Sequence, residues 1–388
     1  MITEIKVASS TEFSSGEAVQ AFIDNVNESD NAAAVISRLG PFFDCSEPWS
    51  SEQLSRNVLV SVQNLLENRS GNTIDTVQSV IFNHVKPYFT TQHKSVNTDT
   101  GRVRMRELAS EHTDTIDTPP WKTQAYGIWG TLALLMSLAD ISKCWFMFLP
   151  PTMSMLDDHE PFFKLRGVKL LRTLIDALDA KTIQQAGLRT LWEGSLSTSL
   201  TFFAQEHGAE LLVCTTEAML ALYRKSPADV NSLYKLTMES VIQPWFYAGD
   251  KLSVLLPTFT VLPQLLEAMG VYSARFLKAI IPQINRTLLS VSPPSQHSLP
   301  SQLAALNSLD TLIRVCDVRL QQRRVQILDG LVKSYVKADG NAEYAREYTR
   351  KLQSCYSTLK KAVPQVPNDL DALIRAYPPL KALDVDLA

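Results

Sequence analysis

The chain has 388 residues, of which 45% are hydrophobic and 20% charged, and these proportions are those of an ordinary folded protein. The formal net charge of −3 and the isoelectric point near 6.1 give no overall basic field, which argues against a general nucleic-acid-binding protein. The length exceeds that of a usual single core, so we expect two domains or one elongated array of repeats.

The cysteines are odd in number and widely scattered, and no two have Cys-x-x-Cys spacing. We interpret them as reduced, mostly buried residues of an intracellular protein. They are Cys45, Cys144, Cys214, Cys316 and Cys355. The first residues have neither the basic start nor the apolar core of a signal peptide, so secretion is not expected.

The N-terminal part of the chain is predicted to be helical after a disordered start at residues 1–12. Amphipathic periods of 3.6 residues begin after Gly16, at Asn31, after Ser50 and at Thr73. Two helical hairpins are therefore expected before residue 90.

From Thr90 to Pro120 the apolar period is lost, and small polar residues dominate. We interpret residues 91–120 as a polar loop or linker with at most one short helix near 103–109, and as the boundary between domains. It would separate an N-terminal helical region, residues 1–90, from a main solenoid, residues 121–388. The segment also carries a small basic cluster formed by Arg102, Arg104 and Arg106.

Beyond this segment every apolar pattern is helical. A cap and a first-turn proline at Pro120 predict one helix whose apolar face reaches Ala139. The run Ser226-Pro227-Ala228-Asp229 is expected to cap a later helix over residues 230–242, and Pro257 and Pro263 are expected to interrupt an apolar segment. No stretch shows sustained strand alternation, and helix pairs recur at the spacing of HEAT-like units, about 40 to 47 residues. The predicted fold is all-α, an irregular HEAT-like α-solenoid of antiparallel helical hairpins.

The most apolar stretch, residues 126–149, is interrupted by Asp140 and Lys143. Its apolar runs are therefore shorter than the roughly 20 residues that a membrane-spanning helix needs. We interpret it as buried helix and predict no membrane contact.

The chain is organised around residues 148–192, which are predicted to form two helices joined by an acidic turn, followed by the start of a third. In the second helix the period places apolar residues on one arc and polar residues on the other. The apolar arc is Gly167, Val168, Leu170, Leu171, Leu174, Ile175 and Leu178, and the polar arc is Arg166, Lys169, Arg172, Thr173 and Asp176. Glycine inside a helix costs roughly 1 kcal/mol against alanine, so Gly167 predicts a close helix crossing.

This stretch also resembles a known family. A proline-bearing apolar helix, an Asp-Asp turn, a basic residue and a second apolar helix are typical of a HEAT-type hairpin. The detailed pattern over residues 145–225 resembles the core signature of the Tti-two family. The matching residues are Leu156, Asp157, Asp158, Phe163, Lys164, Gly167, Leu170, Leu171, Gly187, Leu188 and Trp192.

The resemblance implies a non-enzymatic subunit of the TTT co-chaperone complex, bound to a Tti-one-like partner that itself binds a Tel-two-like protein. Such a complex supports the Hsp90-dependent maturation of phosphatidylinositol-3-kinase-related kinases, with links to TOR signalling, the DNA damage response and telomere maintenance. A cytoplasmic and nuclear location is implied as well. Architecture alone leaves another HEAT or armadillo adaptor, such as a transport or trafficking scaffold, as the alternative.

The acidic turn is the one cluster that invites a metal interpretation, since Asp157, Asp158, His159 and Glu160 all carry ligand atoms. Adjacent residues on a tight turn point in different directions, however, and no second ligand set lies at helical spacing. We instead expect Asp157 or Asp158 to cap the following helix and to pair with Lys164 or Arg166.

Other site chemistry is not indicated. The sequence has no nucleotide-binding glycine loop, no nucleophile elbow and no Cys-His signature. We therefore predict no catalytic residue, no cofactor, no metal and no enzymatic activity.

Two further groups of residues could bind a partner. A basic stripe, interleaved with Asp310, Asp317 and Asp329, is more typical of a solvated helix face than of a nucleic-acid site. It comprises Arg314, Arg319, Arg323, Arg324 and Lys333. The tryptophans are expected to be mostly core residues, although an exposed one would suit a protein partner. This expectation concerns five of the six tryptophans, Trp121, Trp129, Trp145, Trp192 and Trp245.

Overall fold

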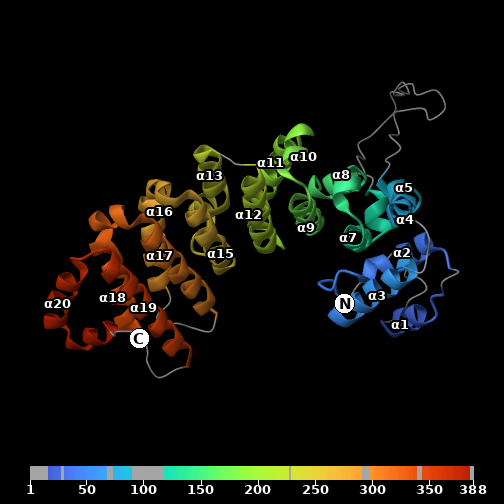
Figure 1. The fold of residues 1–388 in the computed structure, drawn as a ribbon. Helices are drawn as coiled ribbons and strands as arrows, with labels where there is room; N and C mark the ends of the chain where they lie inside the picture. Colours follow the sequence, from blue (N-terminus) through green and yellow to red (C-terminus); the bar gives the residue numbers. More distant parts are fainter. Residues whose placement is uncertain are drawn as a thin grey trace, which may run out of the picture. The chain divides into compact units, whose positions relative to one another are not determined.

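The structure is a computed structural model that describes residues 16–27, 30–67, 73–89, 118–226, 229–290, 297–338 and 343–384. Every regular element within these ranges is helical, as the sequence predicts (Figure 1). Contacts between Cα atoms divide the chain into two compact units. Unit 1 is Met1–Asp158 with Lys169–Asp179, and unit 2 is His159–Val168 with Ala180–Ala388.

The elements of unit 1 are mostly short helices. In chain order they are α1 (Gly16–Asp24), α2 (Ala32–Leu39), the 3₁₀ turn η1 (Gly40–Phe42), α3 (Glu52–Glu67), α4 (Thr73–Val80), the π-helical turn η2 (Ile81–Val85), α5 (Lys86–Phe89), α6 (Pro120–Thr123), α7 (Ile128–Leu138) and α8 (Ile141–Leu156). The next helix, α9 (Pro161–Ala177), contains the boundary between the two groups of contacts.

Unit 2 has longer helices. They are α10 (Ala180–Gln185), α11 (Leu188–Ser199), η3 (Leu200–Phe202), α12 (Gly208–Lys225), α13 (Val230–Thr237), η4 (Met238–Ile242), α14 (Gln243–Ala248), α15 (Leu252–Met269), η5 (Gly270–Phe276), α16 (Leu277–Ser290), α17 (Leu299–Leu320), η6 (Gln321–Arg323), α18 (Arg324–Lys337), α19 (Glu343–Ala362), α20 (Val366–Ala376) and η7 (Pro378–Leu383).

Unit 1 is built around α2, which packs on α3, α4 and α7. The side chain of Asn31 caps α2 by accepting a hydrogen bond from the backbone N–H of Ala33 at 3.0 Å, as expected for a helix that begins there. Close to the end of α2, a Cβ atom on Gly130 would lie 2.7 Å from the carbonyl oxygen of Gly40. The close backbone crossing in unit 1 is therefore made by η1 and α7.

The predicted single helix from Pro120 to Ala139 is wrong, because the structure divides it into α6 and α7. Gly127, between the two, has φ of 91° in the left-handed region that glycine adopts without strain. The break turns the chain so that Trp129 lies in the core of unit 1, where its Nε1 donates to Glu47 Oε1 at 2.9 Å. A continuous helix would not have allowed this placement.

The helices of unit 2 stack as successive hairpins. One row runs α12, α15, α17 and α19, each helix packing on the next, and a second row runs α16, α18 and α20. The rows are joined where α16 packs on α17 and α18 packs on α19. One hairpin cannot bury its own apolar face, so each is completed by its neighbours. This arrangement matches the predicted hairpin stacking.

The two prolines that were expected to interrupt unit 2 do not do so. Pro257 and Pro263 lie inside α15, which is continuous from Leu252 to Met269. Residues 252–289, which include α15 and α16, are long and apolar enough by composition to cross a membrane, with a mean hydropathy of 1.4. These helices pack within unit 2, and 56% of the apolar window is buried there. Burial in the protein accounts for the apolar composition.

Some predictions fall outside the described residues. These are the disordered start at 1–12, the cluster Arg102, Arg104 and Arg106, the short helix at 103–109 and nearly all of the linker 91–120. The division into 1–90, 91–120 and 121–388 stays a prediction, and the contacts divide the chain at a different place, placing α6 to α8 with the N-terminal helices.

Candidate functional site

The acidic turn joins α8 to α9. Its first residue, Asp157, is the C-cap of α8, and its backbone N–H donates to the carbonyl oxygen of Met153 at 2.9 Å. Helix α9 begins at Pro161, and the carbonyl oxygen of Glu160 accepts the N–H of Lys164 at 3.1 Å. Glu160 therefore holds the N-cap position that the sequence analysis had given to Asp157 or Asp158.

Asp158 makes an ion pair that the sequence did not reveal. Its two carboxylate oxygens lie 2.8 and 2.9 Å from Nζ of Lys122. Lys122 lies on the short helix α6 of unit 1. The side chains are only 7% and 3% exposed, so this is a buried ion pair. Thirty-six residues separate the partners, and no local pattern connects them. The pairs predicted with Lys164 or Arg166 stay predictions.

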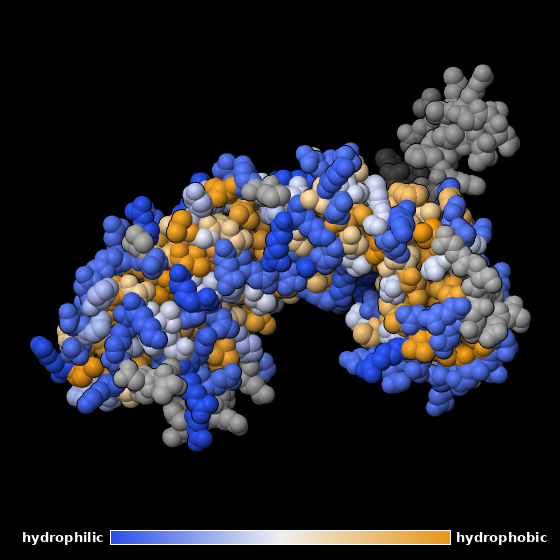
Figure 2. Space-filling model, in the orientation of Figure 1, coloured by the Kyte–Doolittle hydropathy of each residue, from blue (hydrophilic) through white to orange (hydrophobic). Residues whose placement is uncertain are grey.

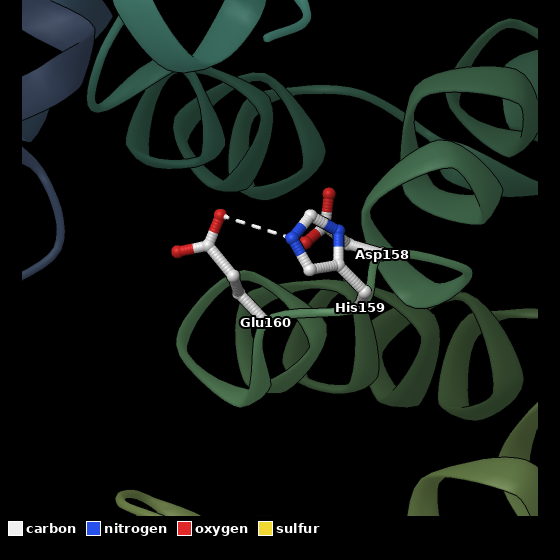
Figure 3. Close-up of side chains that lie close together, drawn as sticks. All are labelled: Asp158, His159 and Glu160. Carbon is white, nitrogen blue, oxygen red and sulfur yellow. Dashed lines mark ion pairs between the residues drawn. The ribbon is translucent and has the colours of Figure 1, made fainter. Parts of the chain in front are cut away.

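The geometry of the acidic turn gives little support to a metal site there. One ligand atom each from Asp158, His159 and Glu160 lies within 4.8 Å of the others, and Figure 3 shows these three successive side chains. His159 Nε2 and Glu160 Oε1 are 3.8 Å apart, and both side chains are largely exposed. A cation would have to compete for Asp158 with the buried ammonium of Lys122. We therefore interpret the acidic turn as a structural feature that connects α8 to α9.

The basic residues after the turn are buried against aromatic rings. Nζ of Lys164 lies 5.3 Å from the centre of the Phe202 ring, and the guanidinium of Arg166 lies 3.5 Å from that of Phe162. Arg166 also donates to the carbonyl oxygen of Phe162 at 3.1 Å. Arg166 belongs to the predicted polar arc of the helix but is buried, and its guanidinium lies over the Phe162 ring, whose face attracts a cation.

The apolar arc of α9 is confirmed, since its members are buried throughout. They are Gly167, Val168, Leu170, Leu171, Leu174, Ile175 and Leu178. Leu156, at the end of α8, and Phe163 are buried as well. These motif residues contribute to the core and present no reactive group.

The last motif residues begin α11. Gly187 is its N-cap with φ of 65° and ψ of 18°, and a Cβ atom there would have no neighbour within 4 Å. Position 187 therefore favours glycine only because its backbone is left-handed, and not because a side chain would lack space. Leu188 and Trp192 follow on the buried face of α11. The spacing of these residues in the sequence did not indicate that any of them is needed for a particular backbone conformation.

The most exposed aromatic residues lie where α14 meets α15. Phe246 is 84% exposed and Tyr247 is 74% exposed, and their rings contact each other edge to face at 5.3 Å. Leu252 and Leu256, on the first turns of the adjoining α15, are exposed too. We call these four residues the α14–α15 apolar tip. On the face drawn in Figure 2, hydrophobic residues also come to the surface over the part of unit 2 around α13 and α16.

The tip was not found from the sequence. Phe246 and Tyr247 follow Trp245 in one aromatic run, and Trp245 is buried, with its Nε1 donating to Thr258 Oγ1 at 2.8 Å. From the sequence, all three aromatic residues of this run would be expected in the core. The only sequence signal is that three successive helical residues span about 200° around the helix axis and cannot all face the same core.

The other candidate residues have ordinary structural roles. The basic stripe is interleaved with acidic partners, with Arg314 at 3.3 Å from Asp310 and Lys333 at 2.7 Å from Asp329. This confirms the interpretation as a solvated face. Four of the five predicted core tryptophans are buried, and Trp145 is half-buried. None of the five cysteines, all of which lie within the described residues, forms a disulfide, and three of them are buried.

Comparisons with known proteins give a family and a fold. A sequence model described as the Tti2 family matches residues 35–293, more than half of the chain, and this segment includes every residue of the Tti-two motif. A crystal structure of importin beta is similar with a TM-score of 0.51 at 12% sequence identity. The similarity covers 93% of this chain and 41% of the importin beta chain. At this identity it shows the fold alone, and the predicted HEAT-like α-solenoid is confirmed.

Proposed function

The chain belongs to the Tti2 family, a family of scaffold proteins of the TTT complex, and we propose that it works as a non-enzymatic subunit that binds a Tti-one-like protein. That partner would in turn hold a Tel-two-like protein. The assembly would act with the Hsp90 system on phosphatidylinositol-3-kinase-related kinases, which need it to reach stable levels. No nucleic acid, membrane or cofactor takes part in this proposal.

The observation that carries the proposal is the family match across residues 35–293. The alternative was an adaptor that shares only the architecture, such as a transport scaffold. The match speaks against it, because a family model reads residue identities along the chain and not architecture alone. The similarity to importin beta gives transport no support, since that likeness concerns the fold.

The α14–α15 apolar tip is the part of the described surface best suited to anchor the Tti-one-like partner. Single exposed apolar residues are ordinary, but two contacting aromatic rings on α14 and two exposed leucines on the adjoining α15 expose more apolar area than a single residue does. Aromatic side chains of this size bury about 150 to 250 Å² each and dominate binding energies at interfaces. Phe246 and Tyr247 are largely exposed and contact each other, so a partner helix could cover both rings.

Co-purification tests the proposal directly. The full chain and a tagged Tti-one-like protein are co-expressed, and the complex is quantified by size-exclusion chromatography and biolayer interferometry. We expect the wild-type chain to form a stable complex. The double variant Phe246→Ser/Tyr247→Ser should bind at least about 30-fold more weakly, which corresponds to a loss of 2 kcal/mol or more at a hot spot.

Phe146→Ser is the matched control, because Phe146 is an exposed phenylalanine on α8 in unit 1. It should leave binding unchanged. Capture of the partner by neither wild type nor control would contradict the assignment to a TTT-type complex. Full capture by the double variant would instead contradict only the role of the tip.

The cellular consequence is tested by depletion. Removing the protein should lower the amounts of several phosphatidylinositol-3-kinase-related kinases while their messenger RNA levels stay constant, since chaperone assistance acts after translation. Re-expressed wild-type protein should restore the kinases and the tip double variant should not. The proposed cytoplasmic and nuclear location is checked in the same cells by fractionation. Kinase amounts that do not change after thorough depletion would overturn this part of the proposal.

A further inference from the structure

Unit 1 has an open groove between α1 and α3 that the family assignment does not explain. Its volume is about 400 Å³. None of its nine lining residues is charged, and none is aromatic. Five of them have polar side chains and four are aliphatic. Such a lining is unusual on a surface that is otherwise rich in charges.

The α3 wall presents a regular stripe. Asn57 and Asn64 are seven residues apart, which is nearly two helical turns, so both side chains lie on one face with a rise of about 10.5 Å between them. Val60 and Ser61 lie between them on the same face. Val60 is 53% exposed, and covering it would remove apolar surface from water. The wall therefore alternates carboxamide, apolar group and carboxamide.

The α1 wall repeats the chemistry. Gln20 and Ile23 come from α1, and Val26 and Asn27 come from the residues that follow the end of α1 at Asp24. Asn57 Nδ2 donates to Gln20 Oε1 at 2.6 Å and so joins the two walls. Each of the two groups makes a second bond, because Asn57 Oδ1 accepts from Gln53 Nε2 at 2.9 Å and Gln20 Nε2 donates to Asp24 Oδ1 at 2.8 Å. A carboxamide has two donor hydrogens and two acceptor lone pairs, so each group keeps one of each.

The lining excludes several ligand classes. Without a cation the groove offers nothing to a phosphate or a nucleic-acid backbone, and without an aromatic ring it offers no face on which a base or a sugar could stack. A peptide group, in contrast, presents one N–H and one C=O, which a carboxamide can satisfy together. The spacing of about 10.5 Å is close to one turn of an extended polyproline II chain, which has three residues at about 3.1 Å each, so main-chain groups three residues apart face the same side.

We propose that the α1–α3 groove binds an extended, uncharged peptide segment through its main chain, with small apolar side chains of that segment placed against Val60 and Ile23. Recognition depends on the peptide backbone and therefore tolerates different sequences. This activity goes beyond the proposed scaffold role, and its test uses residues of unit 1 that do not belong to the α14–α15 apolar tip.

The probe is a random 12-residue peptide library displayed on phage, panned against the full-length chain. Enriched peptides are synthesised, and their binding to the chain is measured by fluorescence anisotropy. Asn64→Ala should weaken binding about fivefold, the value of one neutral hydrogen bond, and Asn57→Ala/Asn64→Ala should weaken it about 25-fold. Methylating one central backbone nitrogen of the peptide should weaken binding to the same degree, and raising the salt concentration should have little effect.

Gln63→Ala is the matched control, because Gln63 is an exposed carboxamide on α3 that does not line the groove. It should bind peptide like the wild type, and thermal melting should show that all variants are folded. The proposal is overturned if panning enriches no peptide, or if enriched peptides bind the Asn57/Asn64 double variant undiminished. Self-association of the chain that Asn64→Ala abolishes would make a second copy the occupant and would overturn it as well.

Discussion

The hydroxyl of Ser308 on α17 donates to the backbone carbonyl oxygen of Phe259 on α15 at 3.1 Å, in the buried core of unit 2. Phe259 lies four residues before Pro263, whose ring nitrogen has no hydrogen to give that carbonyl. The neighbouring helix thus supplies the donor that the proline lacks. The same hydroxyl shares its hydrogen with the carbonyl oxygen of Ala304 at 2.9 Å.

This relationship predicts coupling between Ser308 and Pro263. Ser308→Ala should lower the free energy of unfolding by about 1 to 3 kcal/mol, because a buried carbonyl loses its donor. In a Pro263→Ala background the same change should cost about 1 kcal/mol less, since the new N–H reaches Phe259. Urea unfolding of the four proteins of the double-mutant cycle measures the difference. Strictly additive effects would contradict the account.

The buried ion pair predicts unequal roles for the two aspartates of the acidic turn. Asp158→Ala removes the carboxylate beside buried Lys122 and should cost about 3 to 5 kcal/mol. Asp157→Ala should cost about 0.5 kcal/mol or less, because Asp157 is exposed and caps α8 through its backbone N–H. Replacing the pair by Lys122→Met/Asp158→Leu should cost less than Asp158→Ala alone. Similar losses in the two single variants, measured by urea unfolding, would contradict this assignment.

Two glycines near α11 should respond to alanine in opposite directions. Both have open space where a Cβ would lie, but only Gly187 has a left-handed backbone. Gly187→Ala should cost about 1 to 2 kcal/mol of backbone strain. Gly194→Ala, within α11, should stabilise by up to about 1 kcal/mol because alanine favours the helix. Thermal midpoints that move in the same direction would show that contacts, and not backbone conformation, decide the effect.

Buried thiols and a buried phenol should make the chain sensitive to alkali. Burial raises the pKa of Cys316 to about 11, and that of Cys355 to about 12, from an ordinary value of 9.0. Burial likewise raises the pKa of Tyr348 to about 12. The folded state holds these protons when the unfolded chain has already released them. The resulting stability is complete below about pH 9 and is lost as the pH rises through 11 to 12.

The measurement is the thermal midpoint between pH 8 and pH 11. Wild type should keep its midpoint up to about pH 9 and lose stability steadily above that pH, and Cys316→Ala/Cys355→Ala should lose it less steeply. Cys45→Ala is the matched control, because Cys45 is exposed, and it should follow the wild type. A thiol reagent at pH 8 should modify Cys45 at once and the two buried thiols only on unfolding. Prompt reaction of all the thiols in the native protein would be incompatible with this burial.

The sequence was sufficient for what depends on local periodicity. The buried arc of α9 and the start of a helix at Asn31 follow from 3.6-residue spacing, and both are found as predicted. Asp229 likewise caps α13 by accepting the N–H of Ser232 at 2.9 Å. The motif over residues 145–225 also led to the family, because it consists of residue identities.

Tertiary structure decided what depends on residues distant in the chain. Lys122 meets Asp158 across 36 positions, and Ser308 reaches Phe259 across 49, so no local pattern could have joined them. For the same reason the continuity of α15 through Pro263 was missed, since the compensating hydroxyl comes from another helix. Burial of Arg166 and exposure of Phe246 have a common cause. Hydropathy sets the average environment of a residue type, whereas the packing of neighbouring helices decides which member of a run is covered.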